Sequence, residues 1–379
     1  EKRTLTRLAP SVDKADMETG VARTPIKDLK QYAVDLEARL GMSAGFMRNI
    51  RSRLPQKSKP KIVFTEGLNQ RILHAVSILS EEGLINPIIL GEKVKVHQRM
   101  DELGLGHLKS IEIFTPEDDK NYETFFMDYH KTRQRKGATF TLSQEIMKHP
   151  NYFGSMMVKH GLADGMITGA TQNYKECITP ILRVLGTRKK AKATGIIILV
   201  FKQKVYFLAD CTVQIDPSAE DLANIAGSAS ILYQKIMMKE PRVAFLSFSN
   251  FGSNPCAETI KIKEAVKIAK EKFPKMIVDG EMQADVAVNE TIRNNLFNFT
   301  SMDKNADVLI FPNLSSSNIS YKLLSQLGNA TPIGPILAPM NYAVNIVQRT
   351  STVEEIVHMS NMTALIALEY QKIKSEKKK

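Results

Sequence analysis

The feature that most constrains the fold is a repeated alternation of short apolar runs with helical patterns, which begins at Lys61. Short apolar runs occur at residues 61–64, 86–91, 111–114 and 165–168, and helical spacing follows several of them, as in Arg71 to Leu79. Such runs are typical of strands buried on both faces of a parallel sheet, and the helices between them are the crossovers that a parallel sheet requires. The pattern predicts an α/β domain over residues 61–190.

The same alternation restarts near residue 191. Strands are expected at 195–201, 205–209, 242–248, 276–280 and 308–311, with helices beginning near Pro217, Glu258 and Asp285. The proline-rich run 331–337 is interpreted as a return to the first domain, which the helices after Val353 complete. We therefore predict an α/β fold of two αβα domains, with mainly parallel sheets and a cleft between them. Domain I is residues 61–190 plus 335–379, and domain II is residues 191–334.

Residues 1–60 do not continue this pattern. Leu29 to Leu40 has the spacing of an amphipathic helix, which Gly41 would end. Residues 47–60 are basic and contain Pro55 and Pro60, so we interpret them as a linker.

The composition limits the function classes. The formal net charge is +12, and much of it lies in the 51–61 segment and in the lysine-rich C-terminal tail. This charge is either solvated or attracts a polyanionic ligand. No Trp is present and no aromatic residues alternate with the basic runs, which argues against a nucleic-acid partner. The three cysteines are far apart, so no metal site is expected, and the sequence contains no apolar run long enough for a membrane span. A cytoplasmic protein is predicted.

The stretch Asp307 to Leu327 is the strongest candidate for a binding site. It reads as a strand, a polar loop and a helix opened by Asn318 or Ser320. A helix N-terminus leaves backbone N–H groups unpaired and suits a phosphate or carboxylate, and Lys322 adds a full charge. A plain strand-to-helix turn without a ligand is the alternative.

Two other stretches carry candidate ligand contacts. Four basic residues, among them Arg133, precede Gly137, and they form either a charged helix end or a phosphate clamp. The pair Gly169–Ala170 follows a strand, and its small side chains let a ligand or another backbone approach closely.

These motifs together resemble the phosphate acetyltransferase and butyryltransferase family from about residue 60 to the end of the chain. The matching blocks, in the family's order, are FTEG (64–67), DG with TGA (164–170), ADCTV with DPSAE (209–220), PRVA with LSFS (241–249), VDGEMQ (278–283), FPNL with NI and YKL (311–323), and IGPIL (333–337). Active members of that family transfer an acetyl group between the sulfur of CoA and phosphate, in a cleft between two αβα domains.

The resemblance implies a ligand site for acetyl-CoA. Carried over position by position, that site consists of Arg133, Thr168, Asn313, Ser317, Asn318, Tyr321, Lys322 and Arg349.

Several catalytic positions depart from the family's pattern. The family's late Ser-Arg-Gly-Cys motif reads Gln348, Arg349, Thr350 and Ser351 here, and its proton-accepting aspartate becomes Glu355. A second cleft arginine falls on Thr179, and two glycines beside Asn318 and Ile319 become Ser317 and Ser320. Each catalytic group can contribute about a hundredfold or more, so the losses argue against transferase activity. CoA binding can persist, because most CoA contacts lie away from the reacting atom.

Residues 1–46, with METGVARTPIKD and LEARLG, resemble the end of the nucleotide-binding domain of bacterial malic enzymes. Hybrid malic enzymes carry a transferase-like domain at the C-terminus, so the resemblance implies an acetyl-CoA-binding regulatory domain of an NADP-dependent malic enzyme. NADP and a divalent metal would belong to the upstream domains. The expected partners are acetyl-CoA, the malic enzyme domains and further copies in a homodimer or higher homo-oligomer. An active phosphate acetyltransferase and a domain kept mainly for assembly are the alternatives.

Overall fold

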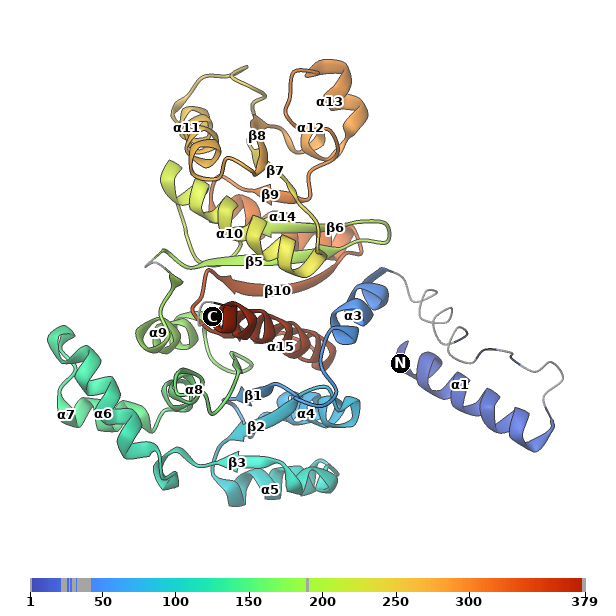
Figure 1. Ribbon diagram of the computed structural model, residues 1–379, viewed down its shortest axis with the longest axis vertical. Coiled ribbons are helices and arrows are strands. Elements are labelled where there is room, and N and C mark those ends of the chain that lie inside the picture. The colour runs from blue at the N-terminus through green and yellow to red at the C-terminus, as the bar shows by residue number, and fades with distance from the viewer. Residues whose placement is uncertain are drawn as a thin grey trace.

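The computed structural model describes residues 2–21, 26, 28, 32, 42–188 and 191–376. Two β-sheets, each covered by helices on both faces, lie one above the other in Figure 1, with the long C-terminal helix α15 between them. The predicted α/β fold of two αβα domains is confirmed. The predicted helix from Leu29 to Leu40 lies almost entirely outside the described residues.

The first domain contains a five-stranded sheet in the order β11-β4-β1-β2-β3. Every neighbouring pair in this sheet is parallel. Its strands are β1 (Lys61–Phe64), β2 (Asn86–Leu90), β3 (Glu112–Phe114), β4 (Gly165–Thr168) and β11 (Ala343–Ile346). Its helices are α4 (Gln70–Glu82), α5 (Lys93–Glu102), α6 (Tyr122–Arg133), α7 (Phe140–Met147), α8 (Pro150–Lys159), α9 (Tyr174–Val184) and α15 (Val353–Glu376).

The second domain contains a six-stranded sheet in the order β10-β5-β6-β9-β7-β8. This sheet is mixed, because β5 runs antiparallel to both β10 and β6 while the other pairs are parallel. Its strands are β5 (Thr194–Val200), β6 (Val205–Ala209), β7 (Arg242–Leu246), β8 (Ile277–Met282), β9 (Val308–Ile310) and β10 (Thr331–Ala338). Its helices are α10 (Ala219–Met237), α11 (Ala257–Lys272), α12 (Ala284–Val288), α13 (Glu290–Leu296) and α14 (Leu314–Leu327).

The interpretation of residues 331–337 as a return to the first domain is wrong. These residues form most of β10, an edge strand that pairs with β5 from Thr331↔Val200 to Ala338↔Thr194. Prolines are tolerated at a sheet edge and at a bulge, and the register of this pair shifts between Ile333 and Ile336. The chain therefore crosses back to the first domain after Ala338, and the predicted boundary at 334/335 falls inside a strand.

The interpretation of residues 47–60 as a linker is also wrong for its first half. Helix α3 (Met42–Ser52) buries Met47 and Ile50, and Leu54 follows it into the same core. The helix packs against both α15 and β5, so it joins the two domains. Arg53 then donates to the carbonyl oxygens of Lys235 and Ile236 at the end of α10, both at 2.8 Å. The basic residues of this segment led to the linker interpretation, although its apolar residues form one face of an amphipathic helix.

Helix α1 (Lys2–Thr19) lies apart from both sheets in Figure 1. No helix among the described residues is long and apolar enough to cross a membrane.

Candidate functional site

A pocket of about 370 Å³ opens between the two domains. The second domain supplies one wall from α14, with Tyr321, Lys322 and Ser325, and from the start of β10. The first domain supplies the other wall from the segment that joins β11 to α15 and from the first turns of α15. The volume falls in the range of ~300–1,000 Å³ that is usual for small-molecule sites.

Five of the predicted ligand contacts and degenerate catalytic positions line this pocket, and they come from both domains. The full set that lines it is Tyr321, Lys322, Gln348, Ser351 and Glu355. Arg349 does not line the pocket, although it is exposed and lies in the sequence between two lining residues, Gln348 and Thr350. The cleft predicted between the domains therefore contains most of the late motif and part of α14.

The predicted start of α14 is wrong. The helix begins at Leu314, and the side chain of Asn313 caps it by accepting from the backbone N–H of Ser316 at 3.0 Å. The N–H of Leu314 donates to the carbonyl of Ile215 at 3.0 Å. The polar stretch was read as a loop because Ser and Asn favour turns, yet here they occupy the first two helical turns. At least two N–H groups at the observed helix start therefore already have protein partners.

Ser317 and Asn318 fix α14 to the end of β6. The hydroxyl of Ser317, which is fully buried, donates to the carbonyl of Asp210, and the side-chain amide of Asn318 donates to the carbonyl of Cys211 at 3.2 Å. The carboxylate of Asp210 accepts from four backbone N–H groups at 2.9–3.1 Å, although burial still raises its pKa. These predicted ligand contacts therefore support the helix that carries Tyr321 and Lys322.

Gln348 connects the two walls of the pocket. Its side-chain amide donates to the hydroxyl of Tyr321 at 3.3 Å, across the boundary between the domains. Its backbone N–H donates to the hydroxyl of Ser351 at 3.0 Å, and Ser351 is buried. A serine at position 348 would be too short for the contact with Tyr321.

Glu355 is part of a capping box at the start of α15. Its carboxylate accepts from the N–H of Thr352 at 3.0 Å, and its own N–H donates to the Thr352 hydroxyl at 3.2 Å. This reciprocal pair satisfies two N–H groups that the helix start would otherwise leave unpaired. A carboxylate held in this way is a structural group, so its geometry favours a cap over a proton acceptor.

Two residues that the sequence analysis did not select hold the late segment in place. Arg71 donates to the carbonyl oxygens of Arg349 at 2.8 Å, Ser351 at 2.6 Å and Ala170 at 2.7 Å. Glu66, buried beside it, accepts from the backbone N–H groups of residues 169–171 at 2.6–2.8 Å. The position of Glu66 directly after a strand, inside the FTEG block, was the available signal.

The close approach predicted at Gly169 is made by backbone. A Cβ atom built on Gly169 would lie 2.4 Å from the carbonyl oxygen of Val347, and the residue has φ +107°. Only glycine combines that dihedral with that space. The carboxyl-terminal ends of β4 and β11 therefore lie in close contact, next to the segment that carries Gln348.

Like Asn313, Ser317 and Asn318, three further predicted positions lie outside the pocket. Thr168 is buried, and its hydroxyl is bonded to Thr65 and to Asn151, both at 2.8 Å. Arg133 is the last residue of α6, and Figure 1 shows α6 at the outer edge of the first domain, away from α14. Thr179 lies on α9 beside a separate, open surface hollow. Gly137, at φ +85°, ends the short helix after Arg133, which matches the charged-helix-end interpretation of that turn.

Lys322 is the basic residue among those that line the pocket, and Glu355 supplies a carboxylate. Among the described residues, no group of His, Cys, Asp and Glu side chains could hold a metal ion. The residues that line the pocket are suited to an anionic ligand with polar groups.

Known proteins have sequences similar to this chain. The family model for phosphate acetyl/butaryl transferases matches residues 45–364. The phosphate acetyltransferase of Bacillus subtilis (strain 168) is 38% identical over 309 residues, which is 81% of this chain and 95% of that protein. The NADP-dependent malic enzyme of Escherichia coli (strain K12) is 33% identical over 376 residues, which is 98% of this chain but 49% of that protein. The chain thus spans about half the length of its malic enzyme relatives.

Solved structures agree. A phosphotransacetylase from Streptococcus pyogenes superimposes with a TM-score of 0.80 at 33% identity, covering 86% of this chain and 98% of that one. The EutD phosphotransacetylase from Staphylococcus aureus gives the same TM-score at 30% identity. The family match, the sequence identity and the shared fold therefore show that this chain belongs to the phosphate acetyl/butaryl transferase family.

Proposed function

We propose that this chain is an acetyl-CoA-binding regulatory domain of an NADP-dependent malic enzyme, and that it binds its ligand without transferring the acetyl group. One observation carries the proposal: the side chains at the family's late catalytic positions are engaged in structural hydrogen bonds around an open pocket. Gln348 binds Tyr321, and Glu355 caps α15. The pocket remains while the groups that would act on a substrate are committed elsewhere.

The extent of the sequence match supports the link to malic enzymes. The match to the E. coli malic enzyme covers 98% of this chain, whereas that to the B. subtilis phosphate acetyltransferase covers 81%. A chain that served only as a transferase would have no need for the additional residues. In this proposal, NADP and a divalent metal are bound by the malic enzyme domains, and the chain assembles with those domains and with further copies of itself.

The ligand would contact both domains. Lys322 lies on α14 of the second domain, whereas Arg349 lies between β11 and α15 of the first. A ligand that touches both stabilises one relative arrangement of the domains over others, and that difference in binding energy is what a regulatory effect requires. The malate-oxidising domains would respond to this arrangement through α3 and the residues before it.

An active phosphate acetyltransferase is the second candidate. The 38% identity to a protein named phosphate acetyltransferase favours it. Against it stands Gln348, whose amide is bonded to Tyr321. The position carried over for the family's second cleft arginine is Thr179, which supplies no charge to offset phosphate and lies outside the pocket.

Two measurements on the same preparation separate these functions. Calorimetry with acetyl-CoA is expected to show saturable binding, and a coupled assay of CoA with acetyl phosphate is expected to show little or no turnover. Robust turnover would establish the second candidate and overturn the first. If neither acetyl-CoA binding nor turnover is detected, the remaining interpretation is a domain kept mainly for assembly. In the full malic enzyme, acetyl-CoA is expected to lower malate-dependent NADPH production.

A further inference from the structure

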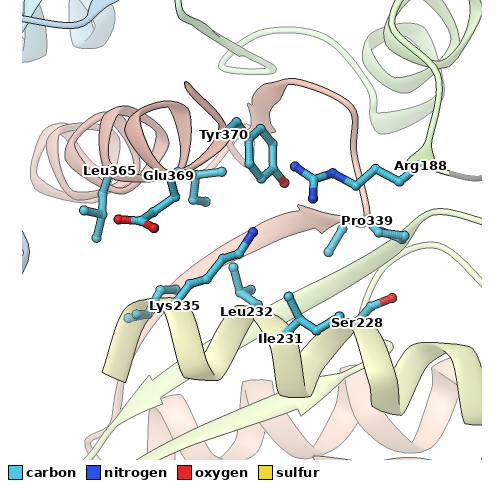
Figure 2. Close-up of a pocket in the computed structure, with 12 residues that line it drawn as sticks. Arg188, Ser228, Ile231, Leu232, Lys235, Pro339, Leu365, Glu369 and Tyr370 are labelled. Carbon is cyan, nitrogen blue, oxygen red and sulfur yellow. The ribbon is translucent and has the colours of Figure 1, made fainter. Parts of the chain in front are cut away.

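A second cavity, of about 70 Å³, lies between α10 of the second domain and α15 of the first (Figure 2). None of the residues that line it lines the interdomain pocket. Its walls are mainly aliphatic and include Leu232, Ile236, Leu365 and Ile366. At about 10–15 Å³ per water-sized group, the cavity holds roughly five to seven such groups.

Two cationic side chains at the cavity's rim make cation–π contacts with the same aromatic ring. The guanidinium of Arg188 lies 4.1 Å from the ring centre of Tyr370, and the Lys235 ammonium lies 5.0 Å from it (Figure 2). Within the described chain, no carboxylate lies at ion-pair distance from either cation. The nearest candidate, Glu369, instead pairs with Arg53 at 3.7 Å and with Lys372 at 2.9 Å.

The two like charges lie over one ring, and Glu369, which also lines the cavity, offsets the charge of Lys235 without forming an ion pair with it. Arg188 is fixed because its Nε donates to the carbonyl of Met340 at 2.9 Å, and its terminal nitrogens have no hydrogen-bond partner among the residues that the structure describes. Burial and the charge of Arg188 lower the pKa of Lys235. An anion at the rim would offset the repulsion between the two cations, and the aliphatic walls would contact an apolar tail.

We propose that this cavity is a ligand site for a small monocarboxylate with an unbranched apolar tail of about three to five carbons, a length set by its volume. The carboxylate accepts from Arg188 and Lys235, and the tail packs among Leu232, Leu365 and Ile366. The rim carboxylate of Glu369 disfavours a dianion such as a phosphate monoester, because like charges in a partly buried site repel. This site is independent of the function proposed above.

The test titrates the 379-residue chain, labelled at its Ile and Leu methyl groups, with hexanoate in NMR experiments. Hexanol and hexylamine serve as probes of the same length without the negative charge. The variants are Lys235→Gln and, as the matched control, Lys239→Gln, which removes an exposed charge one turn further along the same segment.

Hexanoate is expected to give saturable shifts at Leu232 and Ile366. Its affinity should fall by roughly tenfold or more in Lys235→Gln, since a hydrogen bond to a charged group is worth at least that factor. Lys239→Gln should bind like the parent. The proposal is overturned if hexanol or hexylamine binds as tightly as hexanoate, if Lys235→Gln is unaffected, or if the shifts appear at Ile333 of the interdomain pocket instead.

Discussion

Replacing Arg71 with alanine tests how the candidate site is held together. The guanidinium makes three hydrogen bonds, to the carbonyl oxygens of Arg349, Ser351 and Ala170, and it joins α4 to the segment that carries Gln348. Each such bond from a charged donor contributes about 1.5–3 kcal/mol. The segment at Arg349 is exposed, so water replaces part of the loss, and we expect the free energy of unfolding to fall by about 2–4 kcal/mol.

Urea unfolding followed by circular dichroism measures this change. With an m-value of about 3 kcal/mol/M, the midpoint should fall by roughly 1 M. Arg71→Lys should lie between the parent and Arg71→Ala, because an ammonium keeps the charge but lacks the planar fork. The matched control is Arg99→Ala, which removes an exposed pair with Glu102 and should cost less than about 0.5 kcal/mol. If Arg71→Ala unfolds at the same midpoint as Arg99→Ala, the three bonds do not hold the segment.

The same variant separates stability from binding. At temperatures where Arg71→Ala stays folded, the segment that carries Gln348 and Arg349 is no longer held in its binding position. We therefore expect acetyl-CoA affinity to fall roughly tenfold, which corresponds to about 1.4 kcal/mol. Full affinity in a destabilised variant would mean that the segment adopts its binding geometry without the clamp.

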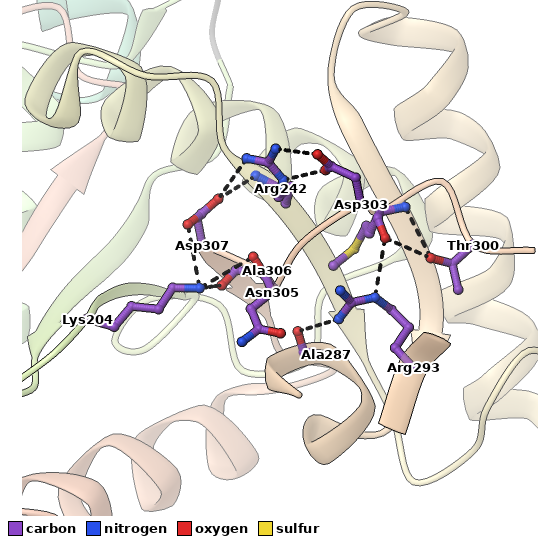
Figure 3. Close-up of polar contacts among 10 residues, drawn as sticks. Lys204, Arg242, Ala287, Arg293, Thr300, Asp303, Asn305, Ala306 and Asp307 are labelled. Atoms are coloured by element: carbon purple, nitrogen blue, oxygen red, sulfur yellow. Dashed lines mark hydrogen bonds and ion pairs between the residues drawn. The ribbon is translucent and has the colours of Figure 1, made fainter. Parts of the chain in front are cut away.

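Three shorter predictions concern other parts of the chain. Arg349→Glu should weaken acetyl-CoA binding in calorimetry by about 2 kcal/mol or more, and an unchanged affinity would exclude Arg349 from the site. The hydrogen bond from Arg242 lowers the pKa of Asp303 from 3.8 to about 2 (Figure 3). This pair therefore stabilises the fold above pH 3.8, and its contribution is lost as pH falls through about 2. Asp303→Asn should flatten acid unfolding over that window, and a parallel curve would contradict the assignment. Ile50→Ala should cost about 2–5 kcal/mol in urea unfolding if α3 belongs to the core, whereas a linker would tolerate it.

The alternation of strands and helices was predictable because its signal is local and strong. The all-buried β5, with TGIIILV, reads as an apolar run whichever strands surround it. The missed elements are those in which one signal masked another. The basic residues of α3 indicated a linker, and the prolines of β10 indicated a connection between the domains. The Ser and Asn residues after Asn313 indicated a loop, although they form the first turns of α14.

Only the site residues that belong to the family's motifs were predicted from the sequence. Tyr321, Lys322 and Gln348 meet at the pocket because the family's chain order brings them there. Arg71 and Glu66 were missed because their roles depend on carbonyl and N–H groups of segments about 100 to 280 residues away. Those partners are backbone atoms, so no residue type in the sequence marks them.

The positions of the two cavities follow from where the chain crosses between the domains. It leaves the first domain after α9 and returns after β10, and these two crossings are bonded to each other. The N–H of Arg188 donates to the carbonyl of Pro339 at 2.9 Å, and Asn341 donates to the carbonyls of Leu185 and Thr187, both at 3.1 Å. Domain movements are absorbed by a few residues at such joints. The α10–α15 cavity includes Arg188 and Pro339, so it borders the joint, whereas the interdomain pocket lies farther toward the start of β10 and of α15. A ligand in the pocket would therefore favour an angle between the domains, and a ligand in the cavity would stiffen the joint about which that angle changes.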